Sequence, residues 1–280
     1  MRISRKTRAN LLRGVGLLVD SYAPQLCLFC DRPSFRHEPL CDTCAAAFIR
    51  NSGACPGCAL PDCAGAPCPA CQYRPLPLRI IAPFVYERTM AWLLRRWKYD
   101  RERRLVAALA LLAVTDPLRH AHGAGSLSTA ALAADDRRGS DCAASVSLGA
   151  AAQACGPESL ALPTPLHWRR RLHRGFNQSA DLLHAAGRRN PELAGACSRA
   201  GKVRLLRRHA THPQARATRS DRLRNLRDAF AVHGAIADRP VLLIDDVCTT
   251  GATGVAMATA LREAGARSVT LWCLARTPEH

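Results

Sequence analysis

The chain has 280 residues, a hydrophobic content of 48% and a formal net charge of +18. Its length and hydrophobicity indicate a globular protein with one sizeable domain and a smaller one. No run of about 18 apolar residues is present, so we expect no membrane span. The apolar run at residues 15–19 is too short for a secretory signal, so we expect a basic helix over residues 1–22 and a cytoplasmic protein.

The positive charge favours partners that carry phosphate, nucleic acids among them. Only three of the 40 basic residues are lysines, however. Heavy use of arginine and alanine also arises from a GC-rich genome, so charge alone does not define a nucleic-acid-binding protein. A positive surface of either origin attracts phosphates at low salt.

Nine of the fourteen cysteines lie within residues 27–71, and eight of them form CxxC pairs. The pairs are Cys27/Cys30, Cys41/Cys44, Cys55/Cys58 and Cys68/Cys71. Two such pairs on facing hairpins supply four thiolates for a tetrahedral metal, and Zn2+ is the usual occupant. A disulfide framework is the alternative, which the missing secretory signal disfavours. We therefore predict a double zinc ribbon over residues 23–76.

All four ligands of each predicted site are cysteines, so no coordination position is open and the zinc is expected to be structural. The module has many turn residues and few core residues, so metal must supply much of its folding free energy. The second site has a complication in Cys63, which lies midway between Cys58 and Cys68. Cys63 either replaces one ligand or lies free.

Next along the chain, Ile80 to Tyr86 is predicted to be a strand, and Met90 to Tyr99 has the apolar and basic faces of a helix. The aromatic residues Trp92, Trp97 and Tyr99 lie among basic residues in this helix. They either stack on nucleic-acid bases or form the buried face of an amphipathic helix. We favour the buried face.

A second helix is predicted over residues 104–118, before a change in composition. Residues 120–158 are rich in Ala, Ser and Gly, and we predict that most of this segment is an inserted loop of low order. Leu160 to Leu166 then read as a strand that ends in a proline-locked turn.

Four arginines stand before a helix that is predicted to begin near Phe176, and Gly175 gives the backbone freedom there. They are Arg169, Arg170, Arg171 and Arg174. Guanidinium groups at a helix start suit a diphosphate, which they grip with two parallel hydrogen bonds each. A solvated basic loop is the alternative.

The most informative stretch is residues 241–253, VLLIDDVCTTGAT. Four apolar residues predict a buried strand, and Asp245 and Asp246 follow at its carboxyl-terminal edge. A turn rich in hydroxyl groups leads to a helix over Gly254 to Ala264, and Ser268 to Leu274 forms the next strand. This is a βαβ unit.

The small residues of the turn let backbone N–H groups converge on an anion at the positive end of a helix. The two carboxylates would repel a second phosphate, so they suit the hydroxyls of a ribose or a Mg2+ ion. Together these groups predict a ribose 5-phosphate site at the carboxyl end of a parallel strand. The alternative is a polar turn without a ligand, but a single cap needs neither two acids nor three threonines.

The run Asp-Asp, two residues, Thr-Thr-Gly-x-Thr resembles the motif of type I phosphoribosyltransferases that binds 5-phosphoribosyl 1-diphosphate (PRPP). The order of CxxC pairs, a Lys-Tyr helix, Pro-x-Pro-Leu-His, Arg-Gly-Phe-Asn-Gln and this motif is similar to the ComF family. The likeness runs from about Cys27 to Arg276, skips the Ala-rich insert, and departs where Leu-Pro-Thr-Pro replaces Val-Pro-Val-Pro. It implies an α/β domain of the type I phosphoribosyltransferase kind over residues 77–280, a parallel sheet flanked by helices.

The resemblance also implies roles for individual residues. Asp245 and Asp246 would face the ribose hydroxyls as catalytic residues. The 5-phosphate loop would comprise Val247, Cys248, Thr249, Thr250, Gly251, Ala252 and Thr253. The pyrophosphate loop would include Arg171, Arg174, Gly175 and Asn177, and a lid over the site would include Gln214, Arg222 and Asn225.

The implied reaction is displacement of pyrophosphate from C1 of PRPP, with Mg2+, by a nitrogen acceptor that the sequence does not identify. The transition state would resemble a ribosyl oxocarbenium ion. Competence-associated relatives act in uptake of transforming DNA, which gives an alternative: a non-catalytic protein that binds PRPP or a nucleotide and single-stranded DNA, together with the competence machinery. A homo-oligomer is compatible with either hypothesis.

Overall fold

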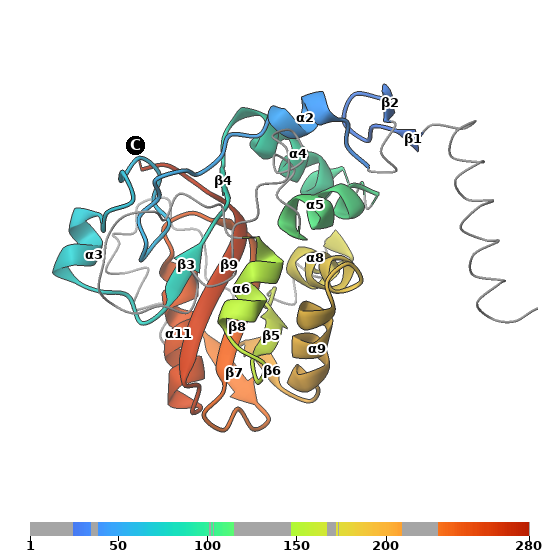
Figure 1. Ribbon diagram of the computed structural model, residues 1–280. Helices are drawn as coiled ribbons and strands as arrows, with labels where there is room; N and C mark the ends of the chain where they lie inside the picture. The colour runs from blue at the N-terminus through green and yellow to red at the C-terminus, as the bar shows by residue number, and fades with distance from the viewer. Residues whose placement is uncertain are drawn as a thin grey trace, which may run out of the picture.

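A computed structural model describes residues 25–34, 39–100, 102, 104–114, 147–166, 172, 174–208 and 229–279. It places a parallel sheet at the centre, helices on both of its faces and a cysteine-rich module at one end (Figure 1). This confirms the predicted α/β class. The predictions for residues 1–22 and for most of the insert lie outside the described residues. So do those for Arg171, Gln214, Arg222 and Asn225.

The central sheet has the strand order β3-β9-β8-β5, and β4 also pairs with β9. Its strands are β3 (Arg79–Ile81), β4 (Phe84–Val85), β5 (Leu160–Pro163), β8 (Pro240–Cys248) and β9 (Ser268–Arg276). All of these neighbours are parallel. The apolar runs of β8 and β9 follow from this arrangement, since helices bury both faces of a parallel sheet.

Strand β8 extends beyond the four apolar residues that predicted it. Asp245 pairs with Cys273 and Cys248 pairs with Arg276, so the ladder with β9 continues past the acidic pair. The partner strand supplies hydrogen bonds there regardless of side-chain polarity, which local hydrophobicity does not reveal. The two acids are therefore part of the strand rather than residues that follow it.

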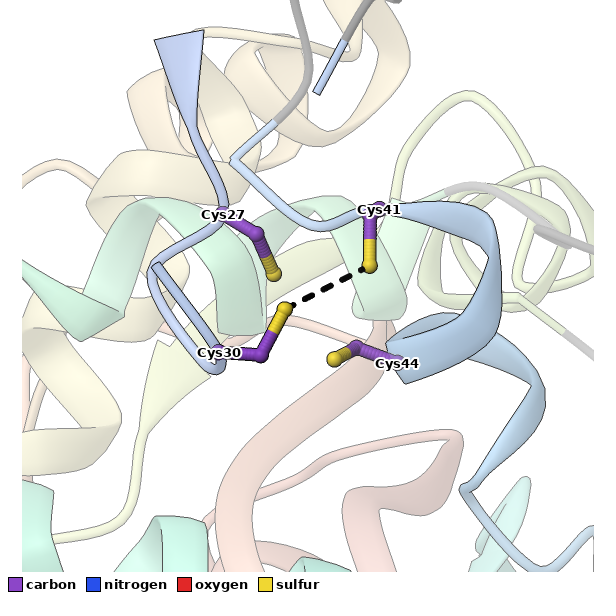
Figure 2. Close-up of side chains that lie close together, drawn as sticks. All are labelled: Cys27, Cys30, Cys41 and Cys44. Carbon is purple, nitrogen blue, oxygen red and sulfur yellow. Dashed lines mark hydrogen bonds between the residues drawn. The ribbon is translucent and has the colours of Figure 1, made fainter. Parts of the chain in front are cut away.

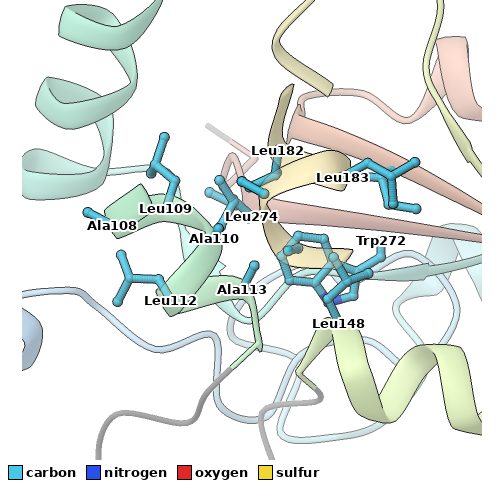
Figure 3. Packing of buried hydrophobic residues seen from close by; sticks show 14 of the residues in the cluster. Ala108, Leu109, Ala110, Leu112, Ala113, Leu148, Leu182, Leu183, Trp272 and Leu274 are labelled. Carbon is cyan, nitrogen blue, oxygen red and sulfur yellow. The ribbon is translucent and has the colours of Figure 1, made fainter. Parts of the chain in front are cut away.

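One side of the sheet is covered by α4 (Arg88–Tyr99), α5 (Leu105–Val114), α6 (Leu148–Ala154), α8 (Gln178–Gly187) and α9 (Pro191–Ala200). Trp272 and Leu274 of β9 meet the alanine and leucine side chains of α5 and α8 in this core (Figure 3). Helix α5 is buried on nearly all sides, which explains why it is apolar all round.

Helix α11 (Ala252–Glu263) covers the opposite side, where Met257 and Leu261 pack with Leu243. It begins two residues before the predicted start at Gly254. A Cβ at Gly254 would lie 2.8 Å from Leu271 Cδ2, so close packing on the sheet requires a glycine there. Beside it, β6 (Arg204–Arg207) and β7 (Phe230–His233) form an antiparallel pair.

The end of the predicted low-order insert forms helix α6. The Ser147 side chain accepts a hydrogen bond from the Ala150 N–H at 3.2 Å and so caps the helix. Leu148 and Ala151 are buried. The prediction of low order was wrong for this part, because alanine is the strongest helix former whatever the complexity of its surroundings.

The cysteine-rich module contains β1 (Gln25–Leu26), β2 (Pro33–Ser34), α2 (Asp42–Ala46) and α3 (Pro69–Tyr73). Its aromatic residues join the core of the larger domain. The Phe29 ring lies 4.7 Å from that of Trp92, and the Phe48 ring lies 5.8 Å from that of Phe84. None of the helices within the described ranges reaches the length and apolarity that a bilayer crossing requires.

Candidate functional site

The first cysteine cluster comprises Cys27, Cys30, Cys41 and Cys44, whose sulfur atoms converge on one point (Figure 2). All four Sγ atoms lie within 4.8 Å of one another, and those of Cys30 and Cys41 are 3.8 Å apart. A tetrahedral Zn2+ with Zn–S bonds of about 2.3 Å requires S–S separations of about 3.8 Å. The cluster therefore fits a structural zinc ion.

The second cysteine cluster comprises Cys55, Cys58, Cys68 and Cys71, again within 4.8 Å of one another. Its Cys58 and Cys68 sulfurs are 3.6 Å apart. Cys63 lies outside it, and its thiol donates instead to the Pro61 carbonyl at 3.5 Å. The later CxxC pair of each cluster lies at the start of a short helix, α2 or α3, so the expectation of facing hairpins was wrong for these pairs.

Backbone N–H groups point at one sulfur in each cluster. Burial raises the pKa of Cys27, but N–H donors, that of Cys41 foremost, outweigh it and lower the pKa to about 7. Cys55 shows the same balance, with burial opposed by donors that include Cys68, and its pKa is also lowered to about 7. The Cys68 N–H lies 3.3 Å from the Cys55 sulfur. Since the thiolate is the form that binds metal, these donors suit bound zinc, which would supply folding free energy to the module.

A cavity of about 210 Å3 opens at the carboxyl end of β8. It is lined by Asp245, Asp246, Arg174 and the threonine loop, defined here as residues 247–253. These residues come from the end of β8, the start of α11 and the segment before α8. The structure thus brings together the acids, the loop and one of the arginines that the sequence singled out.

Asp245 lies at the base of the cavity and is held by a chain of hydroxyl groups. Its Oδ1 accepts a hydrogen bond from Ser179 Oγ at 3.0 Å, and Ser179 Oγ lies 2.8 Å from Thr164 Oγ1. Burial and the neighbouring Asp246 charge together raise the pKa of Asp245 to about 7, against the hydrogen bonds, which lower it. The carboxyl group therefore changes its charge near neutral pH.

Asp246 is 8% exposed and is paired with a lysine from another element. Its Oδ2 lies 2.6 Å from Lys98 Nζ in the last turn of α4, and its Oδ1 accepts the Val247 N–H at 2.8 Å. The ammonium group offsets the cost of burying a carboxylate. Lys98 was not identified as a site residue, although the Lys-Tyr helix of the family pattern carried the signal.

The threonine loop directs polar groups toward the cavity. Gly251 has a φ of +75°, which lets the chain turn into α11. Thr249, Thr250 and Thr253 are exposed. Hydroxyl groups and the first N–H groups of a 12-residue helix therefore face the same cavity.

Residues of the predicted pyrophosphate loop divide into two groups. The Arg174 guanidinium lines the cavity and lies 5.4 Å from the ring centroid of Tyr99. Gly175 supplies a φ of +79° beside it. Asn177 instead caps α8, accepting the Ser179 N–H at 3.1 Å and donating to the Thr164 carbonyl at 3.1 Å. Its position in this structure is that of a helix cap.

Arg207 and Gln178 also line the cavity, although neither was named as a site residue. Arg207 reaches it from β6. Gln178, the first residue of α8, is 2% exposed, and within the described part of the chain its Nε2 has no hydrogen-bond partner. A buried amide without an acceptor is costly, and a turn of this side chain toward the cavity would let a ligand oxygen satisfy it.

Known proteins resemble most of the chain, although no family model matches it. The DNA utilization protein YhgH of Salmonella typhimurium is 30% identical over 262 residues, covering 91% of this chain and 98% of that protein. Competence protein F of Haemophilus influenzae is 33% identical over 123 residues, 43% of this chain and 51% of its own. Competence protein ComFC of Streptococcus pneumoniae is 34% identical over 112 residues, 40% of this chain and 46% of its own.

The fold and the two cysteine clusters define an α/β protein with a cysteine-rich amino-terminal module. The match to YhgH over nearly the full length of both proteins shows the family. The chain belongs to the ComF family of DNA utilization and competence proteins.

Proposed function

We propose that this chain is a cytoplasmic accessory protein of DNA utilisation that binds PRPP or a related nucleotide in the cavity at the end of β8. One observation carries the proposal: two carboxylates, a hydroxyl-rich helix start and the cations Lys98 and Arg174 all line the same cavity. The relatives' names, which refer to DNA utilization and competence, support the biological setting.

In this proposal each part of the cavity receives one part of PRPP. The threonine loop holds the 5-phosphate, and Asp245 and Asp246 accept hydrogen bonds from the ribose hydroxyls. The diphosphate, with Mg2+, lies toward Arg174 and Lys98. By resemblance to the family, Arg171 and a lid that includes Gln214, Arg222 and Asn225 complete the site.

Calorimetric titration of PRPP with Mg2+ into zinc-loaded protein tests this proposal. We expect saturable binding that is lost in Thr250→Ala and in Asp246→Asn. Thr259→Ala is the matched control, because Thr259 is exposed on α11, does not line the cavity and donates to the Val255 carbonyl within its own helix. A folded wild-type protein that binds neither PRPP nor a nucleotide contradicts the proposal.

The exposed side of α4 supports binding of single-stranded DNA as part of the same role. Trp92 is 42% exposed, and the Arg96 guanidinium, which also pairs with Glu102, lies 4.5 Å from its ring; Tyr99 is 67% exposed. Aromatic rings stack on bases, and neighbouring arginines contact phosphates; neither contact requires a particular sequence. We expect salt-dependent binding of a single-stranded oligonucleotide that survives Asp246→Asn. No binding even at low salt contradicts this part.

A second candidate function is transfer of the ribose 5-phosphate. The cations at the cavity favour it, because pyrophosphate must leave C1 with the electron pair of the broken C–O bond. A nitrogen acceptor forms the new C–N bond and gives up a proton. Pyrophosphate release with a panel of nitrogen acceptors tests the candidate: release that Asp246→Asn abolishes supports it, and no release with any acceptor contradicts it.

A further inference from the structure

Arg276, the last residue of β9, is a buried arginine that is 3% exposed. Within the described residues its guanidinium donates mainly to backbone carbonyl groups, and no carboxylate pairs with it. Nε donates to the Cys58 carbonyl at 3.1 Å, and Nη1 donates to the carbonyls of Cys248 at 3.4 Å and of Thr249. A buried charge of this kind depends on every one of its acceptors.

Nη1 also donates to the carbonyl of the neighbouring Thr277 at 2.9 Å and to its hydroxyl at 3.3 Å. The other acceptors belong to two different sites. Cys58 is a ligand of the second cysteine cluster, whereas Cys248 and Thr249 belong to the threonine loop. The planar guanidinium therefore bridges the second cysteine cluster and the threonine loop. Because the guanidinium is rigid, the directions of its Nε–H and Nη1–H bonds fix the Cys58 carbonyl relative to the two loop carbonyls.

A second contact joins the same two sites. The Ile80 N–H donates to the carbonyl of Gly57, within the cluster's first CxxC turn, at 2.9 Å. The Ile80 side chain reaches the threonine loop, since its Cδ1 lies 3.3 Å from the position of a Cβ at Gly251. The turn around the second cluster is thus packed beneath the loop.

We infer that Arg276 is a positioning residue that couples the second cysteine cluster to the threonine loop, so that a metal-filled cluster strengthens binding of a phosphate ligand in the cavity. The inference rests on the proposed function for the nature of the ligand. Metal restricts the motion of the turn that carries the Cys58 carbonyl. Arg276 is bonded to that carbonyl and so restricts the motion of the Cys248 and Thr249 carbonyls as well. Loss of the turn leaves a buried guanidinium short of an acceptor and the loop free to shift.

Such coupling is reciprocal. If a filled cluster raises the affinity of the cavity for its ligand, the ligand must raise the affinity of the cluster for zinc by the same factor. The effect is specific to the second cluster, because Arg276 donates to a carbonyl of that cluster.

The main experiment compares full-length wild type with Cys68→Ser/Cys71→Ser, which removes two ligands of the second cluster. Cys63→Ser is the matched control, since Cys63 is a neighbouring thiol outside both clusters. We expect two zinc ions per chain in wild type and Cys63→Ser and one in the double variant. With PRPP and Mg2+ as the probe, the double variant should bind about tenfold more weakly.

Arg276→Met then decides whether the arginine transmits the effect. When Arg276→Met is combined with Cys68→Ser/Cys71→Ser, PRPP binding should be no weaker than in Arg276→Met alone, because the hydrogen bond from Arg276 to the Cys58 carbonyl is already lost. PRPP should also protect the second zinc from a chelator in wild type but not in Arg276→Met. If Arg276→Met does not fold, Arg276→Lys serves instead, because lysine keeps the charge but presents only one nitrogen.

Hydrogen–deuterium exchange of the threonine-loop amides tests the inference without a ligand. We expect faster exchange in Cys68→Ser/Cys71→Ser than in Cys63→Ser. Failure of PRPP to bind wild type would overturn the proposed function and leave exchange to decide the coupling. Unchanged exchange in the double variant, or additive effects of cluster loss and Arg276→Met, would overturn the coupling.

Discussion

Lys98 Nζ lies 2.6 Å from Asp246 Oδ2, so an ion pair joins the last turn of α4 to the end of the central strand. The other end of α4 packs against the cysteine-rich module, where Trp92 meets Phe29. One helix therefore touches both the amino-terminal module and the cavity. Its lysine is well placed to neutralise Asp246 in the free protein and to attract phosphate groups.

Replacement of Lys98 by methionine should weaken binding of PRPP with Mg2+ by at least about tenfold. It removes a cation from the cavity and leaves Asp246 buried without its partner, and both changes disfavour an anionic ligand. Calorimetry on the folded variant gives the measurement. Lys202→Met is the control, because Lys202 is exposed and does not line the cavity. Equal affinities in the two variants would contradict a role for Lys98.

Asp245→Asn should stabilise the protein, and by more at about pH 8 than at about pH 6. The folded-state pKa of Asp245 is raised to about 7 by burial and by the charge of Asp246. The folded protein therefore holds this proton more tightly than the unfolded chain, and ionised Asp245 destabilises the fold. Its unfavourable contribution grows as pH rises from about 4 to about 7, and asparagine removes it.

Thermal unfolding of wild type and Asp245→Asn at both pH values measures this difference. Both values avoid strongly acidic solution, in which protons displace metal from thiolates. Asp238→Asn is the control, since Asp238 is exposed and does not line the cavity. An advantage of Asp245→Asn that is the same at both pH values would contradict the raised pKa.

Local sequence predicted those parts of the cavity that are close together in the chain. The acids, the threonine loop and the helix after them form one βαβ unit, so strand and turn signals suffice to place them. The spacing of the CxxC pairs likewise predicted both cysteine clusters. Exclusion of Cys63 depended on the folded turn around Pro61, which spacing does not encode.

Residues that reach the cavity from distant elements were harder to predict. Lys98 reaches the cavity because α4 packs across the sheet end, and Arg276 reaches the carbonyls of the threonine loop, though not the cavity itself, because β9 extends beside β8. Each is one of 40 basic residues in the chain, so composition does not distinguish it from the others. The extent of β8 was underestimated for a similar reason, since its last residues are held by a partner strand rather than by their own hydrophobicity.

Trp97 and Trp92 should respond in opposite ways to substitution. Trp97 is fully buried, which confirms that this ring belongs to the buried face of an amphipathic helix. The alternative, that Trp97 stacks on nucleic-acid bases, is wrong. Trp97→Ala should cost about 3 kcal/mol of unfolding free energy, whereas Trp92→Ala should cost about 1 kcal/mol. Urea denaturation measures both values.

Binding of single-stranded DNA separates the two rings further. Trp92→Ala should weaken binding several-fold, because it removes an exposed ring beside Arg96. Trp97→Phe, which keeps an aromatic ring in the core, should leave DNA affinity unchanged. A weaker affinity in Trp97→Phe with no change in Trp92→Ala would contradict the assignment of the exposed face.

Gln178→Leu should weaken binding of PRPP with Mg2+ by about tenfold while it changes the unfolding free energy of the free protein by less than about 1 kcal/mol. The Gln178 amide nitrogen is buried in the cavity wall and has no partner within the described residues, so the free protein loses no hydrogen bond from that nitrogen when it is removed. In the complex, the same nitrogen would donate to a charged ligand oxygen, and that bond is lost. Gln153→Leu is the control, since Gln153 is exposed and its side chain donates to Glu192 away from the cavity. If Gln178→Leu bound PRPP as tightly as wild type, the amide would not face the ligand.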